Sequence, residues 1–555
     1  MKMNRNKSIE NQLSGQAEPL TDERTPAKPV RKQQPGTGAT PDGVYADGMA
    51  GSDTGITQEI CSGGEQSSTE VTSPAKGEDP RAGTGVGAAD SSVDLWDMTT
   101  HGERSGSAFS HAPKRREGPG DGPAKAGIRT PAKKVRKLQI ALYRKAKAEP
   151  KWRFYSLYGE IAREDLLWEA WRRVKARGGA GGIDGVTVSQ IERAEGGAKR
   201  WLGELSRELK AKSYRAAAVR RVMIPKPDGK ERPLGIPTIK DRVVQTAVWL
   251  VLMPIYEADF HPQSYGYRPR RNARQAMEAI KAELWKGRTE IVDADLSAYF
   301  DTIDHRLMLR KLVKRISDGS LLGLIKQWLR APVMEEGPDG ERRSRGNRRG
   351  TPQGGVISPL LANIFLNDLD YGVNEGTQHK ARMVRYADDL VILCAPGQAA
   401  KIKERLTQWL ERRGLRLNEE KTRIVEARKE GFEFLGWRVT PRRSRRGLAY
   451  YHMEPAVKSR VKLMEKVREI LQHRMHWRDV NEVVAELNAV TRGWSQYFRY
   501  GHWREVFHQM DDVIGHRLRK WLWNKQRRSK AQYGHYTKQR MKEQYGWTPM
   551  TESYV

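Results

Sequence analysis

Two aspartates stand side by side between two short apolar runs in the segment VRYADDLVILC, which begins at Val384. Adjacent carboxylates repel each other, so Asp388 and Asp389 cost free energy unless a positive charge compensates them. A hairpin turn is one explanation, because Asp is common in turns and the apolar flanks are typical of strands. A divalent metal that binds both carboxylates is the other explanation, and the short string alone does not decide between them.

A second acidic cluster lies upstream in EIVDADLSAYFDTIDH, which begins at Glu290. Asp293 and Asp295 share one face of a strand, so either could meet Asp388 if the two segments were neighbours in one sheet. Three converging carboxylates would make a site for two Mg²⁺ ions, which prefer oxygen ligands. Two such metals can activate a hydroxyl and stabilise the leaving oxygen of an in-line phosphoryl transfer. Acidic strand ends that face solvent are the simpler explanation for any one of these residues, but a weak one for the set.

The elements that must position these residues follow from the apolar pattern. From about Glu164 to Val439, helical patterns alternate with short β-like runs, which predicts a mixed α/β fold. The most apolar stretch, VVQTAVWLVLMPIYEA, is too short to span a bilayer and is typical of a buried helix. Beyond Arg446 the pattern is wholly helical. Three apolar stripes there predict a helical bundle: Val457, Val461, Met464, Leu471; Val480, Val483, Val484, Leu487; and Val506, Met510, Val513, Leu518, Trp521.

The charge of the chain points to a polyanionic partner. The formal net charge is +32, and residues 1 to 130 carry 15 basic and 18 acidic side chains, which leaves +35 for the remainder. Each phosphate that Lys or Arg neutralises releases counterions, so an excess spread over many segments favours nucleic acid over a merely soluble basic surface. The basic stretch at about 131–161 is equally consistent with an RNA contact and with a solvated helix that has one buried face.

Cysteine usage and the N-terminus bear on location. Cys61 and Cys394 are the only cysteines, so neither a disulfide framework nor a Cys-rich zinc site is available. The N-terminus lacks the apolar core of a signal peptide. These features predict a cytoplasmic protein without a membrane partner.

Several ordered blocks resemble those of group II intron reverse transcriptase/maturases. YADD and DLSAYFD are similar to the two metal-binding motifs of reverse transcriptases. The further blocks are IPKPDGKERPLGIPTIKDRVVQ, SYGYRPRRNARQA, RGTPQGGVISPLLANIFLNDLD, LNEEKT and FLGW, and LNAVTRGWSQYFRYG resembles the maturase domain. The resemblance covers roughly residues 140 to 530. The family pattern, an Asp followed five residues later by an aromatic, selects Asp295 over Asp293 and implies catalytic Asp295, Asp388 and Asp389 with two Mg²⁺ ions.

Other positions then receive expected roles around an incoming dNTP. The turn in IPKPDGKERP could present Lys226 and Arg232 to the triphosphate, although a plain surface turn is the alternative. Gly354 and Gly355 allow close backbone approach, so Gln353 could contact the nucleotide. The resemblance places Phe300 against the deoxyribose, where a core Phe is the alternative.

Lys421 and the C-terminal part of the chain complete the expected site residues. Lys421 could protonate the leaving pyrophosphate as a general acid, or be a helix-terminal cation. The mixture of basic and aromatic residues near the C-terminus suits phosphate contacts and base stacking, although single aromatics there are more often core. The residues expected to bind RNA are Arg492, Trp494, Tyr497 and Arg519.

The expected architecture is α/β plus all-α: a right-hand polymerase of fingers and palm followed by a helical thumb/maturase bundle. Residues 1–130 are expected to be a disordered low-complexity tail, because they bury too little apolar surface. Fingers and palm with an N-terminal extension are expected over 131–440. The thumb/maturase domain is expected over 441–525, and a short basic nucleic-acid-binding segment over 526–555.

The resemblance implies an RNA-directed DNA polymerase that also assists splicing and mobility of its intron. Its expected partners are group II intron RNA, an RNA template, a DNA primer and target, and dNTPs, while the oligomeric state stays open. Two alternatives are an RNA-binding splicing factor without polymerase activity and another bacterial reverse transcriptase, of the retron or diversity-generating type. Many family members carry a C-terminal nuclease with paired cysteines, and no Cys follows Cys394, so we expect that domain to be absent.

Overall fold

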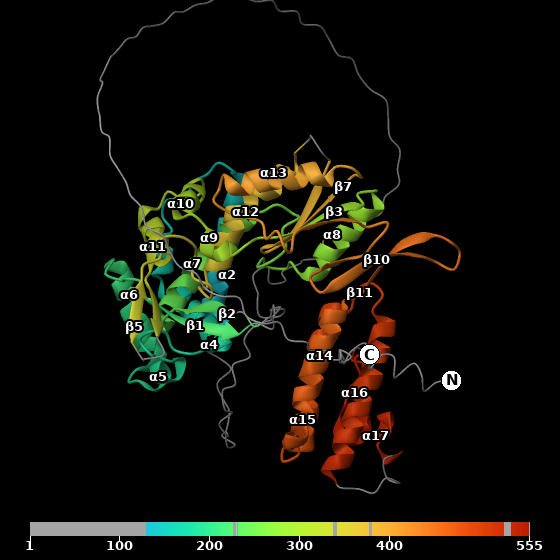
Figure 1. Ribbon diagram of the computed structural model, residues 1–555. Coiled ribbons are helices and arrows are strands. Elements are labelled where there is room, and N and C mark those ends of the chain that lie inside the picture. The colour runs from blue at the N-terminus through green and yellow to red at the C-terminus, as the bar shows by residue number, and fades with distance from the viewer. Residues whose placement is uncertain are drawn as a thin grey trace, which may run out of the picture. The chain divides into compact units, whose positions relative to one another are not determined.

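The computed structural model describes residues 129–225, 229, 231–336, 341–376, 380–526 and 534–553 (Figure 1). Almost all of the tail expected over residues 1–130 lies outside these ranges, and so does Lys226.

A buried helix organises the N-terminal part of the described chain. In α7 (Ile239–Glu257) every residue from Val243 to Tyr256 is buried, as its apolar composition predicted. The basic helix α2 (Arg129–Ala148) and α4 (Glu164–Arg177) pack against α7. The Gln139 amide of α2 donates to the Leu250 carbonyl at 3.0 Å, so the inner face of α2 belongs to the core. Shorter helices accompany them: α3 (Tyr158–Ile161), α5 (Val188–Arg193) and α6 (Gly197–Lys210).

A first sheet follows in the order β2-β1-β4-β5. Strand β1 (Val219–Pro225) covers the predicted run VRRVMIP and pairs antiparallel with β2 (Glu231–Ile236). Strand β4 (Val333–Glu336) runs parallel to β1, and β5 (Arg342–Arg345) pairs with β4.

A central sheet has the order β6-β7-β3-β8. Its strands are β3 (Glu290–Asp295), β6 (Arg382–Tyr386), β7 (Asp389–Cys394) and β8 (Arg423–Glu426). Successive residues of β7 alternate between two apolar cores: Leu390 and Ile392 pack into one, Val391 and Leu393 into the other. Because both faces of the sheet are covered, the run LVILC is apolar throughout instead of alternating with polar residues.

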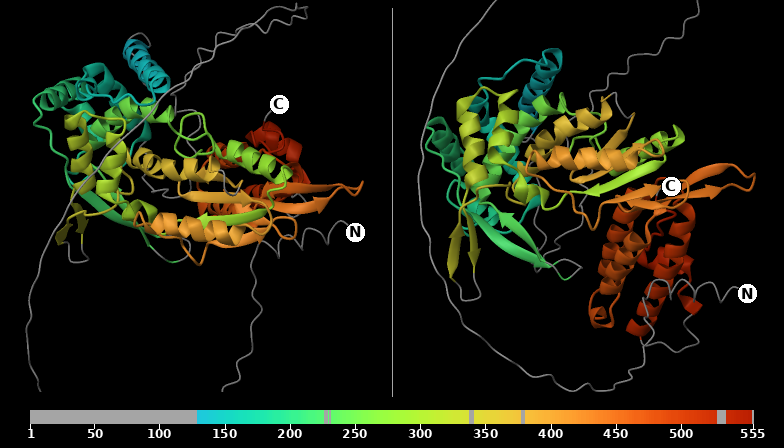
Figure 2. Two further views of the ribbon diagram at one scale, coloured as in Figure 1. Left: turned by 90° about the horizontal axis from the view of Figure 1, so that it is seen from above. Right: turned by 45° about the horizontal axis from the view of Figure 1, so that its top comes forward.

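Helices surround the central sheet. Helices α8 (Ala273–Trp285) and α12 (Ser358–Asn374) contact β6, and α13 (Ala399–Glu411) contacts β3. Between β3 and β4 the chain forms α9 (Tyr299–Thr302), α10 (His305–Val313) and α11 (Gly319–Arg330). Figure 2 shows this part from two further sides.

A third sheet, β11-β10-β9, corrects one expectation. Its strands are β9 (Phe432–Phe434), β10 (Trp437–Arg443) and β11 (Ala449–Pro455), so the expectation that the chain is wholly helical beyond Arg446 was wrong. Strand β11 forms because its backbone pairs along the whole of β10, although its own side chains show little apolar alternation. The boundary expected at residue 440 falls inside β10.

Four α-helices complete the described chain: α14 (Val457–Ile470), α15 (Val480–Phe498), α16 (Arg504–Lys525) and α17 (Lys538–Tyr545), with a short 3₁₀ helix at His473–Met475. The predicted stripes fall on the first three, and Asp479 caps α15 through its side chain. The residues that follow α16 pack into the same core, where Tyr536, Met541 and Trp547 are buried. Among the described residues, no helix is long and apolar enough to cross a membrane.

Candidate active site

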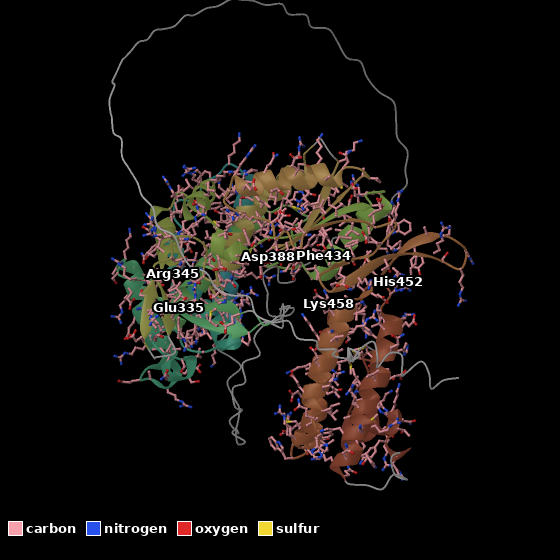
Figure 3. All side chains as sticks on the ribbon, viewed as in Figure 1. Glu335, Arg345, Asp388, Phe434, His452 and Lys458 are labelled. Atoms are coloured by element: carbon pink, nitrogen blue, oxygen red, sulfur yellow. The ribbon has the colours of Figure 1, made fainter. Side chains whose placement is uncertain are left out.

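The adjacent aspartates lie where the β6–β7 hairpin turns. Figure 3 marks the position of Asp388 in the molecule. Tyr386 pairs with Asp389, which leaves Ala387 and Asp388 at the corner. Ala387 has φ +61°, a left-handed conformation that costs a residue with a side chain about 1–2 kcal/mol. Gly266 lies directly against this corner, because a Cβ at that position would come within 2.4 Å of the Ala387 nitrogen. The segment around Gly266 therefore packs against the strained turn and supports it.

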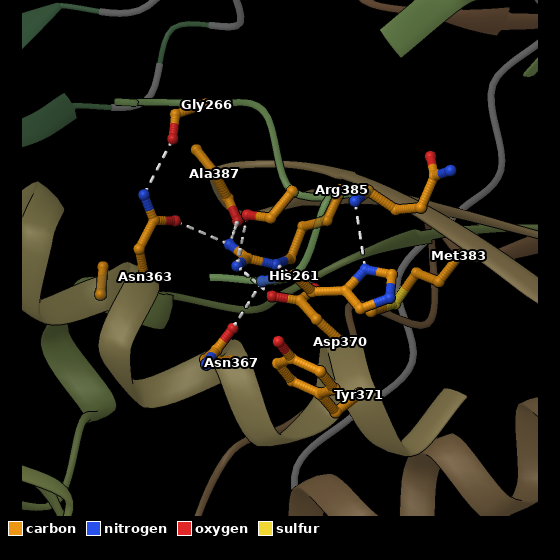
Figure 4. Close-up of polar contacts among 12 residues, drawn as sticks. His261, Gly266, Asn363, Asn367, Asp370, Tyr371, Met383, Arg385 and Ala387 are labelled. Carbon is orange, nitrogen blue, oxygen red and sulfur yellow. Dashed lines mark hydrogen bonds and ion pairs between the residues drawn. The ribbon is translucent and has the colours of Figure 1, made fainter. Parts of the chain in front are cut away.

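A buried arginine holds the same turn from beneath (Figure 4). Arg385 is fully buried and donates through Nε and Nη2 to the two carboxylate oxygens of Asp370, at 2.8 and 2.5 Å. Its Nη1 donates to Asn363 Oδ1 at 2.9 Å and to the Ala387 carbonyl at 2.8 Å, and its Nη2 donates to Ser264 Oγ at 2.8 Å. The guanidinium thus links α12 to the turn that carries the two aspartates.

The register of the central sheet brings the two acidic clusters together. Asp295, at the end of β3, lies directly opposite Asp389, at the start of β7. Directly opposed residues in an antiparallel pair point to the same face of a sheet. Asp293 lies opposite Val391, and its carboxylate accepts from Arg423 Nε at 3.1 Å. Asp295, and not Asp293, is therefore the residue paired with the acidic turn.

The electrostatics of this cluster are unfavourable without a further cation. Burial, and then the charges of Asp388 and Asp295, raise the pKa of Asp389 to about 7. Burial also raises the pKa of Asp388, and the charge of Asp295 adds to it. Asp389 stays exposed to solvent, so water screens part of this repulsion. Lys421, whose Nζ lies 3.1 Å from Asp295 Oδ2, lowers the pKa of Asp389 in part. The charges of Arg232 and Arg385 act in the same direction on Asp388, but burial outweighs them.

The donor set fits a hard divalent cation, because it consists of carboxylate oxygens with excess negative charge. Asp295 is at present engaged by Lys421 and by the Asn418 amide, which donates to Asp295 Oδ2 at 3.3 Å. Within the described ranges, no three His, Cys, Asp or Glu side chains are arranged to hold one metal ion. The fit therefore rests on donor chemistry and charge.

The residues expected to hold a nucleotide form a hydrogen-bonded row beside the acidic turn. Arg232 Nε donates to Gln353 Oε1 at 2.9 Å, and Gln353 Nε2 donates to Asp301 Oδ2 at 2.8 Å. The charge of Arg232 also lowers the pKa of Asp388, against the dominant effect of burial. Phe300, next to Asp301, is largely buried, and its carbonyl accepts from the Thr351 nitrogen. Arg232, Gln353 and Phe300 thus come from separate segments into one neighbourhood.

The residues expected to bind RNA lie apart from this site. Arg492 is exposed on α15. Trp494 is half-buried, with its ring 4.7 Å from that of Phe498. Tyr497 stacks on Trp437 at 4.7 Å and donates its hydroxyl to the Leu435 carbonyl. Arg519 donates to the Tyr536 carbonyl at 2.6 Å, so three of the four side chains are engaged inside the chain.

Several residues that build the site had no recognised signal in the sequence. In the sequence, Arg385 does not stand out from the many other basic residues of the chain, and Asp370 does not stand out from its other acidic residues. Asp301 follows Phe300 and Asn418 lies in the LNEEKT block, but their partners, Gln353 and Asp295, are far away in sequence. A charged residue inside an apolar strand such as MVRYA was the one available signal, because an unpaired charge rarely lies in a buried strand.

Comparisons with known proteins give two family matches. A model described as reverse transcriptase (RNA-dependent DNA polymerase) matches residues 224–439. A second, described as the group II intron maturase-specific domain, matches residues 461–541 and so extends past residue 525 into α17.

Three curated relatives illustrate the similarity. Protein YkfC of Escherichia coli strain K12 is 35% identical over 352 residues, which are 56% of this chain and 90% of YkfC. Group II intron-encoded protein LtrA of Lactococcus lactis subsp. cremoris is 35% identical over 39% of this chain and 35% of its own length. The putative COX1/OXI3 intron 1 protein of Saccharomyces cerevisiae is 29% identical over 50% of this chain and 38% of its own length. The match spans most of YkfC but little more than a third of the other two.

Proposed function

Because this chain belongs to the reverse transcriptases encoded by group II introns, which are RNA-directed DNA polymerases, we propose that Asp295, Asp388 and Asp389 form its catalytic centre. The register that sets Asp295 opposite Asp389 carries this proposal. Like charges directly opposed in a sheet are destabilising, so their presence at a strained turn is explained by a catalytic use.

The parts of a right-hand polymerase are assigned on the same basis. The central sheet is the palm, the β1–β2 pair and the helices before it belong to the fingers, and α14–α17 form the thumb/maturase part. A palm that bears acidic residues at the ends of adjacent strands can hold a primer end and a triphosphate together. Reactants that are already held in place lose less entropy on reaching the transition state.

The reaction is attack of a primer 3′-hydroxyl on the α-phosphate of a dNTP, with RNA as template. Asp295, Asp388 and Asp389 would hold two Mg²⁺ ions, which when bound supply activation of the hydroxyl and charge neutralisation at the leaving oxygen. Arg232 binds the triphosphate, and Gln353 orients the Arg232 side chain through the bond already present. Phe300 lies against the sugar and excludes a 2′-hydroxyl.

Lys421 is the group proposed to give a proton to the leaving pyrophosphate. Its ammonium is largely exposed and rests on Asp295, so it can reach a ligand bound at the acidic cluster. A lysine ammonium carries a transferable proton at neutral pH, and its contact with Asp295 holds it beside the acidic cluster.

The catalytic assignment is tested by primer extension on an RNA template with matched variants. Asp389→Asn and Asp295→Asn should abolish DNA synthesis, because each removes a charged ligand of the centre. Asp293→Asn is the control, since Asp293 lies on the same strand and is paired with Arg423. Binding of structured RNA should persist in all three. Equal losses for Asp293→Asn and Asp295→Asn, or synthesis by Asp389→Asn at the wild-type rate, would contradict the assignment.

The second activity is assistance to splicing of the intron RNA, through the surface of α14–α17. The maturase-specific match over residues 461–541 supports it, and exposed cations such as Arg492 and Lys520 provide phosphate contacts. Binding of intron RNA should weaken steeply as salt rises, and Arg492→Ala should weaken it without changing primer extension. RNA affinity that is the same at low and physiological salt would argue against this surface.

A further inference from the structure

A two-stranded arm, formed by β10 and β11 over residues 437–455, extends away from the helices in Figures 1 and 2. The two strands pair continuously from Trp437 opposite Pro455 to Arg443 opposite Ala449. The turn is closed by the Ser444 nitrogen, which donates to the Leu448 carbonyl at 2.8 Å, and by Ser444 Oγ, which accepts from the Leu448 nitrogen. The arm is thus a regular ribbon to its end.

The base of the arm is firmly packed. Trp437 and Met453 are buried in the apolar core that also contains Val391 and Leu393 of β7. His452 stacks on His502 with ring centroids 4.2 Å apart, and Tyr451 meets the Trp285 ring edge-on at 6.3 Å. Because the base is fixed, the tip is presented at a defined position, which lowers the entropy cost of binding a partner there.

The tip carries an uncompensated cluster of arginines. Within the described ranges, only Arg442 of the four arginines Arg442, Arg443, Arg445 and Arg446 has a carboxylate nearby: Glu454 at 3.8 Å, which Arg460 also approaches at 3.2 Å. Among the described residues, the side chains of Arg443, Arg445 and Arg446 form no ion pair or hydrogen bond. Like charges this close in sequence repel one another in the free protein, and a polyanion would relieve that repulsion.

An apolar side chain completes the tip. Leu448 is 69% exposed and stands among the arginines, without a neighbour that buries it. A ligand that presents phosphates flanking an apolar surface would satisfy both kinds of side chain. The edges of stacked bases between two phosphate backbones have this character, including the methyl group of thymine.

We propose that the β10–β11 arm inserts its tip into the major groove of duplex DNA. A groove of B-form DNA is wide enough for a two-stranded ribbon, whereas the major groove of A-form RNA is too deep and narrow for side chains to read. Arg443, Arg445 and Arg446 contact phosphates or guanine edges, and Leu448 contacts the base edges. The arm lies outside the acidic centre, so this inference goes beyond the proposed polymerase chemistry and does not depend on it.

The salt dependence of DNA binding tests the proposal. The chain and a triple variant, Arg443→Gln/Arg445→Gln/Arg446→Gln, are titrated with a short duplex DNA and with an RNA duplex of the same sequence. Three lost phosphate contacts should reduce the salt slope for DNA by about 2.7, so the loss of affinity between 50 and 200 mM salt becomes about 40-fold smaller. RNA duplex binding should change little. The control carries three exposed cations without ion pairs on α10 and α11: Arg306→Gln/Arg310→Gln/Lys326→Gln.

A cross-linking measurement locates the contact independently. Leu448→Cys in a Cys61→Ser background carries a thiol-linked photo-cross-linker, and Cys394 stays unlabelled because it is buried. It should attach to duplex DNA far more than Tyr155→Cys, a label outside the arm at a residue of similar exposure, 68%. An unchanged DNA salt slope in the triple variant, an equal loss for the RNA duplex, or equal cross-linking by the two labels would overturn the proposal. Primer extension on a short primed RNA should be retained in the triple variant, and its loss would show that the tip belongs to the polymerase site instead.

Discussion

The buried pair of Arg385 and Asp370 should set both the stability of the fold and the position of the acidic turn. Asp370→Asn keeps the shape of the side chain but removes its charge, so the fully buried guanidinium of Arg385 loses its counter-ion. In the unmodified protein both carboxylate oxygens of Asp370 accept hydrogen bonds from Arg385. In the variant, the amide N–H of the new Asn side chain would point at one of the N–H groups of the Arg385 guanidinium.

The magnitude follows from the burial of both partners. Removal of one partner of a buried ion pair lowers the free energy of unfolding by about 3–5 kcal/mol. Here the side chains of Arg385 and Asp370 are both fully buried, so water cannot replace the lost partner. The Arg385 bond to the Ala387 carbonyl is weakened at the same time, so the left-handed Ala387 is free to relax and carry Asp388 with it. We expect kcat for primer extension to fall at least about tenfold, equivalent to about 1.4 kcal/mol. The KM for dNTP should change little, because Arg232 is held from β2.

The assay combines urea unfolding with single-turnover primer extension at a temperature where the variant stays folded. Asp259→Asn is the control, because Asp259 pairs with another largely buried guanidinium, that of Arg315, away from the turn. If Asp370→Asn fails to fold, Asn363→Ala removes one acceptor of Arg385 at a smaller cost of about 1–1.5 kcal/mol. If Asp370→Asn lowers the free energy of unfolding by less than about 1 kcal/mol, or if the folded variant keeps the wild-type kcat, the role given to Arg385 is refuted.

Three further outcomes are expected. The raised pKa of Asp389 means that the folded chain holds a proton which the unfolded chain has released, so stability should fall as pH rises from about 4 to about 7, by about 1–2 kcal/mol after solvent screening. Mg²⁺ should then raise the melting temperature at about pH 8 but not at about pH 5, and Asp389→Asn should remove both effects; a Mg²⁺ shift that persists in this variant would place the ion elsewhere. Arg232→Ala should raise the KM for dNTP about tenfold in steady-state extension, since a charge-assisted contact contributes about 1.5–3 kcal/mol, and an unchanged KM would remove Arg232 from the nucleotide site. Phe300→Val should admit rNTPs in competition assays, whereas wild-type sugar selectivity would show that the ring only fills the core.

Local sequence was sufficient for much of the fold. Strand β1 matches its predicted run, β3 and β7 follow theirs closely, and the three C-terminal apolar stripes fall on α14, α15 and α16. These elements were predictable because their apolar periodicity expresses burial that is the same along the whole element. Strand β11 escaped prediction because its pairing with β10, and not its own side-chain pattern, keeps it extended.

The C-terminal aromatics show the same limit from the other side. Their types and basic neighbours suited RNA stacking, yet Trp494 and Tyr497 pack against Phe498 and Trp437. Aromatic side chains serve cores and nucleic-acid surfaces equally well, so composition cannot tell which way a given ring faces. The helix partners decide it.

The sequence by itself determined which side chains could hold charge at the centre, because acidic residues at strand ends in two ordered blocks have few other uses. Period and charge left Asp293 and Asp295 open, and the family pattern selected Asp295. The physical reason lies in the tertiary structure, which sets Asp295 directly opposite Asp389, since strand register depends on pairing between distant segments. The tertiary structure also decided that Arg385 lies inside and supports the turn. An arginine can be buried only where a carboxylate and several oxygens converge on it, and here those groups come from α12, Ser264 and the turn itself, which are brought together by folding alone.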